Sequence, residues 1–366
     1  MKNVAVLLIG NINTDGRVQK EIASLKASGH VITLIQWAIV GRKVDKEQLG
    51  IDIIDYPLPL SKSPAVNFLR QIRFNFFILA QLKRLRPDIV QCNDLNTLIA
   101  GCLFRRYAKI IYDAHELFPE SHAGPRKIIW TLLERILVPA CHAYIQPEKN
   151  RLAYFSKKLG IKESEIALVE NFPSGKYAFS GRSPLREKLG ISINRKIILY
   201  TGFVIRGREI ENMIQSMSLL DSHLALVLLG PTLQGYDKEL ANLVTTLGLH
   251  DRVYFHPSIP NSEMLDHINS GDIGLVFYPN TNLNNFWCAS NKLYEFIFCG
   301  KPVITNDYPG LKEVVEKNRL GVCLSNSTPE LIASAIKSII EKEPQPKKES
   351  QYVWEKQEET YLKLFC

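Results

Sequence analysis

The amino-acid sequence predicts an α/β protein that contains two successive, doubly wound parallel sheets. Short apolar runs alternate with longer segments of helical period, which is typical of parallel sheets covered by helices on both faces. The pattern occurs twice, and Pro, Ser and Gly cluster between the two series near residues 160–185. The length of 366 residues suits two domains of roughly 100–200 residues each. With 46% hydrophobic and 22% charged residues, the composition excludes a disordered or a disulfide-stapled class.

The first series has six expected strands, which are short and largely apolar: Val4–Ile9, Val31–Gln36, Ile51–Tyr56, Ile89–Cys92, Ile110–Tyr112 and His142–Ile145. A helix is expected at Arg17–Ala27, where apolar residues recur at spacings of four and three. The second series has five expected strands: Lys196–Tyr200, Leu224–Leu229, Val253–Phe255, Ile273–Phe277 and Pro302–Thr305. Three segments between these strands have a helical pattern: Glu209–Leu220, Asp237–Leu247 and Ser262–Asn269.

These series predict two Rossmann-like domains, at residues 1–170 and 171–345. Two prolines within residues 343–349 interrupt the pattern, and residues 346–366 are expected to form a terminal helix that crosses back to the first domain. We expect the two sheets to face each other across a cleft. Ligands of such sheets bind outside the carboxyl ends of the strands, so the loops that follow the strands are expected to carry the chemistry.

The basic residues are concentrated in the first half of the chain. Residues 1–165 contain 24 Lys and Arg against 15 Asp and Glu, whereas residues 166–366 contain 21 against 22. The net charge of +8 therefore arises entirely from the first half. Such an excess suits a nucleic acid, an anionic membrane surface or an acidic substrate, and a solvated surface without a partner is the alternative.

Targeting and redox signals are weak in this sequence. The N-terminal apolar run is too short for a signal peptide, and no run approaches the roughly 20 apolar residues of a membrane span. The seven cysteines lack any CxxC pair, which fits a reducing compartment and argues against a metal site built from cysteines. We expect a cytoplasmic protein, or one attached peripherally to the inner face of a membrane.

Three loops of the first domain hold candidate functional residues. The loop Gly10–Gly16 follows the first strand but lacks the GxGxxG pattern, which disfavours a dehydrogenase; a plain turn capped by Asp15 is the alternative. Asp94 follows the fourth strand. The fifth is followed by His115 and Glu116, and His115 is suited to donate a hydrogen bond or to transfer a proton. A purely structural histidine is the alternative.

In the second domain, the strand Lys196–Tyr200 leads to Gly202 and then to Arg206 and Arg208 before a helix. Guanidinium groups match phosphate oxygens and a helix N-terminus favours anions, so this loop is a candidate phosphate clamp. A basic surface turn is the alternative.

The stretch Ser290–Ile304 is the most specific in the chain. Ser290 is a good N-cap, and Gly300 suits the position that ends the helix. The positive charge of Lys292 in the first turn is unfavourable beside the positive end of the helix dipole, and a bound anion would compensate for it. Glu295 lies among apolar neighbours and needs a partner, which a pair of ligand hydroxyls would supply.

Together these motifs resemble the GT-B glycosyltransferases, in particular glycosyltransferase family 4, over nearly the whole chain. The resemblance rests on these motifs in this order: Asp15-Gly16-Arg17-Val18 with Gly29-His30-Val31, Tyr112-Asp113-Ala114-His115-Glu116, Gly207-Arg208, and Ser290–Ile304 with Asn306-Asp307. It implies a nucleotide-sugar donor held mainly by the second domain and an acceptor held mainly by the first. It also implies transfer with retention of anomeric configuration, without a cofactor or a required metal.

The residues and the resemblance together assign roles to particular positions. The catalytic residues are expected to be His115, Arg208 and Glu295. The nucleotide-sugar donor is expected to contact Gly16, Gly202, Arg206, Arg208, Asn291, Lys292, Leu293 and Glu295. The backbone amides of Asn291 and Lys292 are expected to donate hydrogen bonds to its phosphates. The acceptor side is expected to include Asp15, Asp94 and Glu116. One departure is Trp287, which occupies the position of another glutamate in the family motif.

Two segments of the first domain combine basic and apolar residues, at Lys62–Arg86 and Arg126–Leu137. Both are expected to be helices whose apolar faces either join the core or lie against anionic lipid near a lipid-linked acceptor. A nucleic acid is not expected, because no recognition module is visible.

The function expected from the sequence is retaining transfer of a sugar from a nucleotide-diphosphate-sugar to a glycan or a lipid-linked acceptor, in the synthesis of a cell-surface polysaccharide or glycoconjugate. Two alternatives remain open. A sugar-nucleotide 2-epimerase of the same fold would need acid and base groups, which only Asp94 and the Asp113–Glu116 segment offer. A non-catalytic sugar-nucleotide-binding protein is the second alternative.

Overall fold

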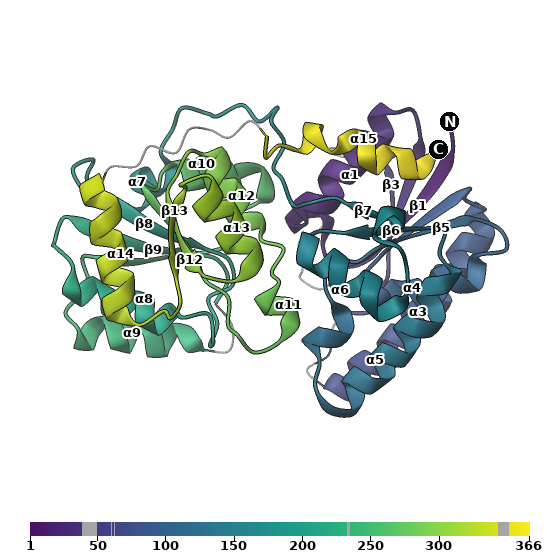
Figure 1. Cartoon of the computed structure of the whole chain (residues 1–366), viewed down its shortest axis with the longest axis horizontal. Coiled ribbons are helices and arrows are strands. Elements are labelled where there is room, and N and C mark those ends of the chain that lie inside the picture. Colours follow the sequence, from purple (N-terminus) through teal and green to yellow (C-terminus); the bar gives the residue numbers. More distant parts are fainter. Residues whose placement is uncertain (39–49, 60, 62, 233–234, 343–350) are drawn as a thin grey trace. The chain divides into compact units, whose positions relative to one another are not determined.

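The computed structural model describes residues 1–38, 50–59, 61, 63–232, 235–342 and 351–366 (Figure 1). The chain divides into two compact units. Unit 1 consists of Met1–Glu170 together with Glu355–Cys366, and unit 2 consists of Asn171–Trp354. Each unit contains one parallel sheet covered by helices, which confirms the predicted α/β class.

Unit 1 contains a seven-stranded sheet in the order β3-β2-β1-β4-β5-β6-β7, and all of its pairings are parallel. Its strands are β1 (Asn3–Ile9), β2 (Val31–Trp37), β3 (Asp52–Asp55), β4 (Ile89–Asn93), β5 (Lys109–Asp113), β6 (Ala143–Gln146) and β7 (Ile166–Leu168). The six strands predicted for this half form within one or two residues at each end. Strand β7 was not predicted because three residues are too few to give a periodic pattern.

Unit 1 has long helices on the sheet and short ones in its terminal segment. They are α1 (Gly16–Ala27), α3 (Pro64–Leu85), α4 (Leu95–Phe104), α5 (Gly124–Leu137), α6 (Lys149–Leu159) and α15 (Glu358–Leu362). The predicted terminal helix is broken, because 3₁₀ turns at Trp354–Lys356 and Lys363–Phe365 flank the five residues of α15.

The alternation of side chains along β4 and β5 decides which face of the first sheet is polar. Cys92 and Tyr112 join the apolar core together with residues of α3 and α4. Successive residues of a strand point to opposite faces, so Gln91 and Asp113 point away from that core. They lie instead with α1 and α15, where they form the charged cluster described below.

Unit 2 contains a six-stranded parallel sheet in the order β10-β9-β8-β11-β12-β13. Its strands are β8 (Lys196–Thr201), β9 (Leu224–Leu229), β10 (Val253–His256), β11 (Ile273–Val276), β12 (Val303–Asn306) and β13 (Gly321–Leu324). All five predicted strands form. Strand β13 was not predicted because it is a short edge strand that begins with glycine and is only half-buried.

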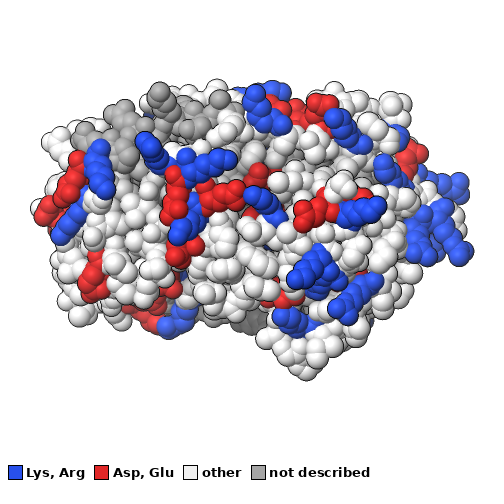
Figure 2. Space-filling model, in the orientation of Figure 1, with Lys and Arg blue, Asp and Glu red and all other residues white. Residues whose placement is uncertain are grey.

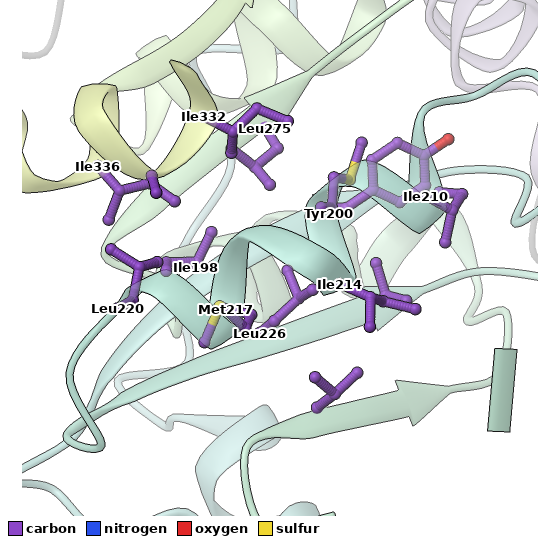
Figure 3. Packing of buried hydrophobic residues seen from close by; sticks show 14 of the residues in the cluster. Ile198, Tyr200, Ile210, Ile214, Met217, Leu220, Leu226, Leu275, Ile332 and Ile336 are labelled. Atoms are coloured by element: carbon purple, nitrogen blue, oxygen red, sulfur yellow. The ribbon is translucent and has the colours of Figure 1, made fainter. Parts of the chain in front are cut away.

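The helices of unit 2 are α7 (Pro184–Leu189), α8 (Ile210–Ser216), α9 (Tyr236–Thr246), α10 (Met264–Asn269), α11 (Leu283–Phe286), α12 (Asn291–Phe298), α13 (Pro309–Lys317) and α14 (Pro329–Lys342). Two separate cores lie on the two faces of the sheet. On one face, Ile214 of α8 and Ile336 of α14 pack with Ile198 and Leu226 of the central strands (Figure 3). Tyr200, near the end of β8, also belongs to this core.

The surface reflects the uneven charge of the sequence. Blue Lys and Arg side chains predominate over unit 1 in Figure 2, whereas red and blue side chains are mixed over unit 2. All seven cysteines are free thiols. Within the part of the chain that the structure describes, no helix has the length and hydropathy needed to cross a bilayer.

Candidate functional site

The strand order of each sheet indicates where a ligand would bind. In unit 1 the order reverses between β1 and β4, and in unit 2 it reverses between β8 and β11. Open parallel sheets bind ligands beyond the carboxyl ends of the strands at such a reversal. The predicted residues of unit 2 follow β8 or belong to α12, the second helix after β11, and those of unit 1 follow β1, β4 and β5. Each unit therefore has one candidate site, and we describe the two separately.

In unit 2, two cations and two aromatic rings form a basic–aromatic cluster, which consists of Arg208, Lys292, Tyr200 and Tyr278. The Lys292 Nζ lies 4.5 Å from the ring centroid of Tyr200 and 5.3 Å from that of Tyr278. The guanidinium carbon of Arg208 lies 5.1 Å from the Tyr278 centroid. Both cations thus lie against aromatic faces, which attract positive charge without neutralising it.

The loop after β8 depends on glycines that allow this close packing. Gly202 has a φ of 120°, and a Cβ added there would lie 2.8 Å from the Cε of Lys292. Gly230 has a φ of 150°, and its added Cβ would lie 1.8 Å from the carbonyl oxygen of Gly202. A side chain at either position would displace the backbone or the lysine. Gly202 therefore contributes to the site by leaving room for Lys292.

Helix α12 begins as the sequence predicted. The Ser290 hydroxyl accepts a hydrogen bond of 3.1 Å from the Leu293 backbone amide, and Tyr278 donates one of 3.0 Å to the same hydroxyl. The Leu293 amide is therefore already bonded, and its side chain lies in the core. Asn291 and Lys292 are the first two residues of the helix, so their backbone amides point out of its N-terminal end.

Arg206 and Arg208, which the sequence suggested as a joint phosphate clamp, have different partners in the structure. The Arg206 guanidinium pairs with Glu239 on the surface, and it lies over the ring of Tyr236. Arg208 is half-buried in the basic–aromatic cluster. Glu295 is half-buried on α12, three residues after Lys292, and Trp287 lies at the end of α11. Among the predicted residues of unit 2, the structure thus brings Gly202, Arg208 and Lys292 together.

The protonation of Lys292 is poised near neutral pH. Burial and the positive charge of Arg208 lower the pKa of Lys292 to about 7, although Glu295 acts in the opposite direction. A bound anion would stabilise the ammonium form and raise this pKa, so binding of an anion is coupled to uptake of a proton.

We therefore expect the affinity for a nucleotide sugar to fall as the pH rises above about 7, by at most about tenfold per pH unit, because at most one proton is taken up. A nucleotide sugar is the right probe, since neither of its phosphates titrates in this range. Isothermal titration between pH 6 and 9, in roughly constant ionic strength, measures the effect. The Lys292→Met variant is expected to show a flat profile, and a variant profile as steep as that of the wild type would contradict this role.

Unit 1 contains a charged cluster that consists of Arg17, Glu21, Gln91, Asp113 and His115. Arg17 donates to both oxygens of Asp113, at 2.8 and 3.2 Å, and its Nε lies 3.0 Å from Glu21. Gln91 donates to Glu21 at 2.7 Å. The His115 Nε2 lies 3.3 Å from Asp113. Asp113 and Glu21 are fully buried, so these charges are compensated mainly by one another.

Asp113 sets the protonation of His115. Burial alone would lower the pKa of His115, but the charge of Asp113 and the hydrogen bond to it raise this pKa to about 10. The Asp113 pKa lies well below its usual range, because Arg17 and His115 outweigh the effect of burial. At neutral pH His115 is thus an imidazolium, which donates hydrogen bonds and is not a base. The sequence left open whether His115 donates a hydrogen bond or transfers a proton, and the structure favours the role of hydrogen-bond donor.

The donor atoms of Glu21, Asp113 and His115 lie within 4.8 Å of one another, as the ligands of a metal ion would. Here, however, the Arg17 guanidinium already forms ion pairs with both carboxylates. Burial and the charge of Asp113 also raise the pKa of Glu21 to about 8, which favours its protonated form. These residues therefore fit a metal ion poorly.

The acceptor-side candidates occupy different places. The Asp94 carboxylate accepts a hydrogen bond of 3.0 Å from the Glu116 backbone amide, which links the loops after β4 and β5. Burial raises the pKa of Asp94 to about 7. Asp15 instead caps α1 by accepting from the Val18 amide at 3.1 Å, and Gly16 is the first residue of that helix. The turn that the sequence analysis gave as an alternative for Asp15 is thus present.

Sequence reasoning missed both tyrosines of the basic–aromatic cluster and several residues of the charged cluster. In unit 1 it missed Arg17, Glu21 and Gln91, although the spacing of four between Arg17 and Glu21 and a glutamine inside an apolar strand were available signals. Tyr361 was also missed; its hydroxyl donates to Gln91 at 2.7 Å from the far end of the chain. No local pattern could have indicated that contact.

Comparison with known proteins agrees with these observations. The family model described as Glycosyltransferase Family 4 matches residues 18–172, and the one described as Glycosyl transferases group 1 matches residues 181–356. A D-inositol 3-phosphate glycosyltransferase from Xylanimonas cellulosilytica is 29% identical over 155 residues. That match spans 41% of this chain and only 35% of the relative.

The solved structures that resemble the chain over its full length include the following two. Sucrose-phosphate synthase from Thermosynechococcus elongatus has a TM-score of 0.80 at 16% identity, and the match covers 100% of this chain and 98% of that one. Anabaena HepE in complex with UDP-glucose has a TM-score of 0.77 at 16% identity, covering 100% and 99%. At this identity the likeness shows the fold, which is GT-B. Together with the two family models, it shows that the chain belongs to the GT4-like glycosyltransferases of the GT-B fold.

Proposed function

We propose that the protein transfers a sugar from a nucleotide-diphosphate-sugar donor to a glycan or lipid-linked acceptor, with retention of anomeric configuration. The observation that carries this proposal is the basic–aromatic cluster at the strand-order reversal of unit 2, where Arg208 and Lys292 are held beside the N-terminus of α12. Cations and free helix amides at this place suit a diphosphate. The UDP-glucose complex of the Anabaena neighbour supports the same class of donor.

The leaving group of such a reaction is a nucleoside diphosphate, whose charge increases as the glycosidic bond breaks. Arg208 and Lys292 provide fixed positive charge for it, and stabilisation of this kind is commonly the largest contribution to catalysis. We assign Glu295 to the ribose hydroxyls, as the family resemblance implies. Because these side chains can supply the compensating charge, we propose that the reaction requires no metal ion.

We assign His115 to the reacting sugar as a hydrogen-bond donor. As an imidazolium it is suited to hold a sugar hydroxyl and to stabilise negative charge, whereas it cannot accept the proton of the incoming hydroxyl. That proton is therefore assigned to an oxygen of the leaving phosphate on the same face of the sugar. This path yields retention without a covalent intermediate on the protein.

The basic surface of unit 1 supports an acceptor located at an anionic membrane. Residues 1–165 contain nine more basic than acidic residues, and Lys and Arg near a membrane surface contribute roughly 1 kcal/mol each. We propose that the protein binds peripherally to the inner face of a membrane and acts in the synthesis of a cell-surface polysaccharide or glycoconjugate.

A thermal-shift panel of nucleotide sugars tests the donor class. A ligand at 100 times its dissociation constant stabilises a protein by about 2.7 kcal/mol, so a true donor raises the melting temperature in a concentration-dependent way. We expect one nucleotide diphosphate sugar to do so and the free sugar to have no effect. A flat response to UDP-, GDP- and ADP-sugars would contradict the proposal. Inversion of the configuration at C2 of the donor's sugar, in the absence of an acceptor, would instead identify an epimerase.

A further inference from the structure

An apolar cavity in unit 1 belongs to neither of the sites described above. Its volume is about 810 Å³, which lies within the range of small-molecule sites, roughly 300–1,000 Å³. Helices α3, α4 and α5 contribute most of its lining, including Ile72, Phe76, Leu103 and Ile129. We call this cavity the α3–α5 groove.

The apolar side chains of the groove remain exposed although their helices are otherwise well packed. On α3, Phe74 and Ile78 are fully buried, whereas Ile72 is 42% and Phe76 67% exposed. On α5, Ile129 is 52% exposed. The sequence left open whether these apolar faces join the core, and the structure divides them between the core and the groove. A contiguous exposed apolar surface of this kind marks a binding site.

The inner end of the groove lies at the carboxyl edge of the first sheet. Ile9 ends β1 and Trp37 ends β2, and both line it, as does Asn96 in the first turn of α4. Asp94, which we assign to the acceptor side, lies two residues before Asn96 and precedes α4 directly. The groove therefore begins beside the candidate acceptor site and extends to the exposed surface of two helices.

The two long helices that line the groove carry mainly basic residues. Helix α3 contains four basic residues and no acidic one: Arg70, Arg73, Lys83 and Arg84. The single acidic residue of α5, Glu134, is buried and pairs with Lys158 at 2.8 Å. Arg126, at the start of α5, lines the groove and is exposed. A ligand that suits this groove thus combines an apolar chain with an anionic group.

From this geometry we propose that the α3–α5 groove binds the aliphatic chain of a lipid-linked acceptor that carries a phosphate. This inference rests on the proposed function, because it identifies the chemical class of its acceptor. A second copy of this chain fits less well, since pairing two grooves would bring two pairs of basic helices together. A chain in the groove places the head of the lipid toward Asp94 and the first-unit site.

Dodecyl phosphate below its micellar concentration is the probe for this site, with dodecanol and inorganic phosphate as comparisons. Titration calorimetry is expected to show saturable binding of one dodecyl phosphate per chain and much weaker binding of either comparison. Binding of inorganic phosphate alone with the same affinity, or no saturable binding of dodecyl phosphate, would overturn the inference.

Two matched pairs of variants locate the binding. Phe76→Gln with Ile129→Gln places amides in the groove, and this variant is expected to bind dodecyl phosphate at least about tenfold more weakly. Leu69→Gln with Ile128→Gln changes exposed residues of the same helices that do not line the groove, and is expected to bind within about twofold of the wild type. Because all four residues are exposed, both variants should fold, which the melting temperature checks.

The remaining outcomes separate the rival occupants. Equal loss in both variants would indicate general adhesion to lipid, and would overturn the assignment to the groove. A dimer that only Phe76→Gln with Ile129→Gln dissociates, seen by sedimentation velocity, would assign the groove to a second copy and also overturn it. The nucleotide-sugar thermal shift is measured on the same variants and should be unchanged. If nucleotide sugars cause no thermal shift in the wild type, the proposed function is contradicted. If they cause a shift but dodecyl phosphate does not bind, only the assignment of the groove to a lipid chain is contradicted.

Discussion

Replacement of His115 by alanine is expected to reduce the rate of sugar transfer by about two to three orders of magnitude, while the affinity for nucleoside diphosphate stays within about twofold of the wild type. The magnitude is that of removing one fixed donor to a developing charge. The reason is that His115 belongs to the charged cluster of unit 1, whereas the diphosphate contacts are assigned to unit 2. Steady-state turnover and calorimetric titration with the diphosphate measure the two quantities.

A second histidine provides the control for this experiment. His250→Ala changes an exposed histidine that lies in neither cluster and is expected to turn over at the wild-type rate. The pH profile adds an independent readout: with the pKa of His115 at about 10, the wild type should keep the imidazolium form well above neutral pH. Wild-type turnover in His115→Ala would show that the charged cluster has a structural role only.

Replacement of Arg208 by alanine is expected to weaken nucleoside diphosphate binding by about tenfold to a hundredfold, the effect of losing a charge-assisted hydrogen bond of about 1.5–3 kcal/mol. The Arg208 guanidinium lies against Tyr278 within the basic–aromatic cluster, beside Lys292. Titration calorimetry at fixed ionic strength gives the dissociation constant of each variant.

Arg206→Ala is the matched control, because it removes the same side chain two residues away. Its guanidinium pairs with Glu239 on the surface, and exposed pairs of this kind contribute little. We expect its diphosphate affinity to stay within about twofold of the wild type. Equal losses in the two variants would mean that Arg206 turns to the ligand on binding and that both arginines form the clamp suggested by the sequence.

The strands and the N-terminus of α12 could be predicted because their signals are local. A short continuous apolar run such as Leu224–Leu229 is typical of a strand buried on both faces, and Ser290 before an apolar helix is a strong cap. Short edge strands such as β7 and β13 give no such signal, since three or four half-buried residues resemble a loop.

The charged cluster could be predicted only in part, because it depends on contacts between distant segments. Asp113 and His115 lie at the end of one strand and were visible, but Arg17 reaches Asp113 across 96 residues and Tyr361 reaches Gln91 across 270. The two arginines after β8 illustrate a further limit. Their side chains differ in direction because Glu239 and Tyr236 attract one and Tyr278 the other, and no sequence pattern specifies these partners.

The measurement that tests the central claim most directly is NMR of the complete reaction, with a ¹³C-labelled nucleotide sugar chosen by the thermal-shift panel and a phosphate-bearing lipid-linked or glycan acceptor. The account predicts that nucleoside diphosphate and glycosylated acceptor appear in equal amounts, and that the new glycosidic bond has the anomeric configuration of the donor. Consumption of the donor without glycosylated acceptor, or a product of inverted configuration, would contradict it.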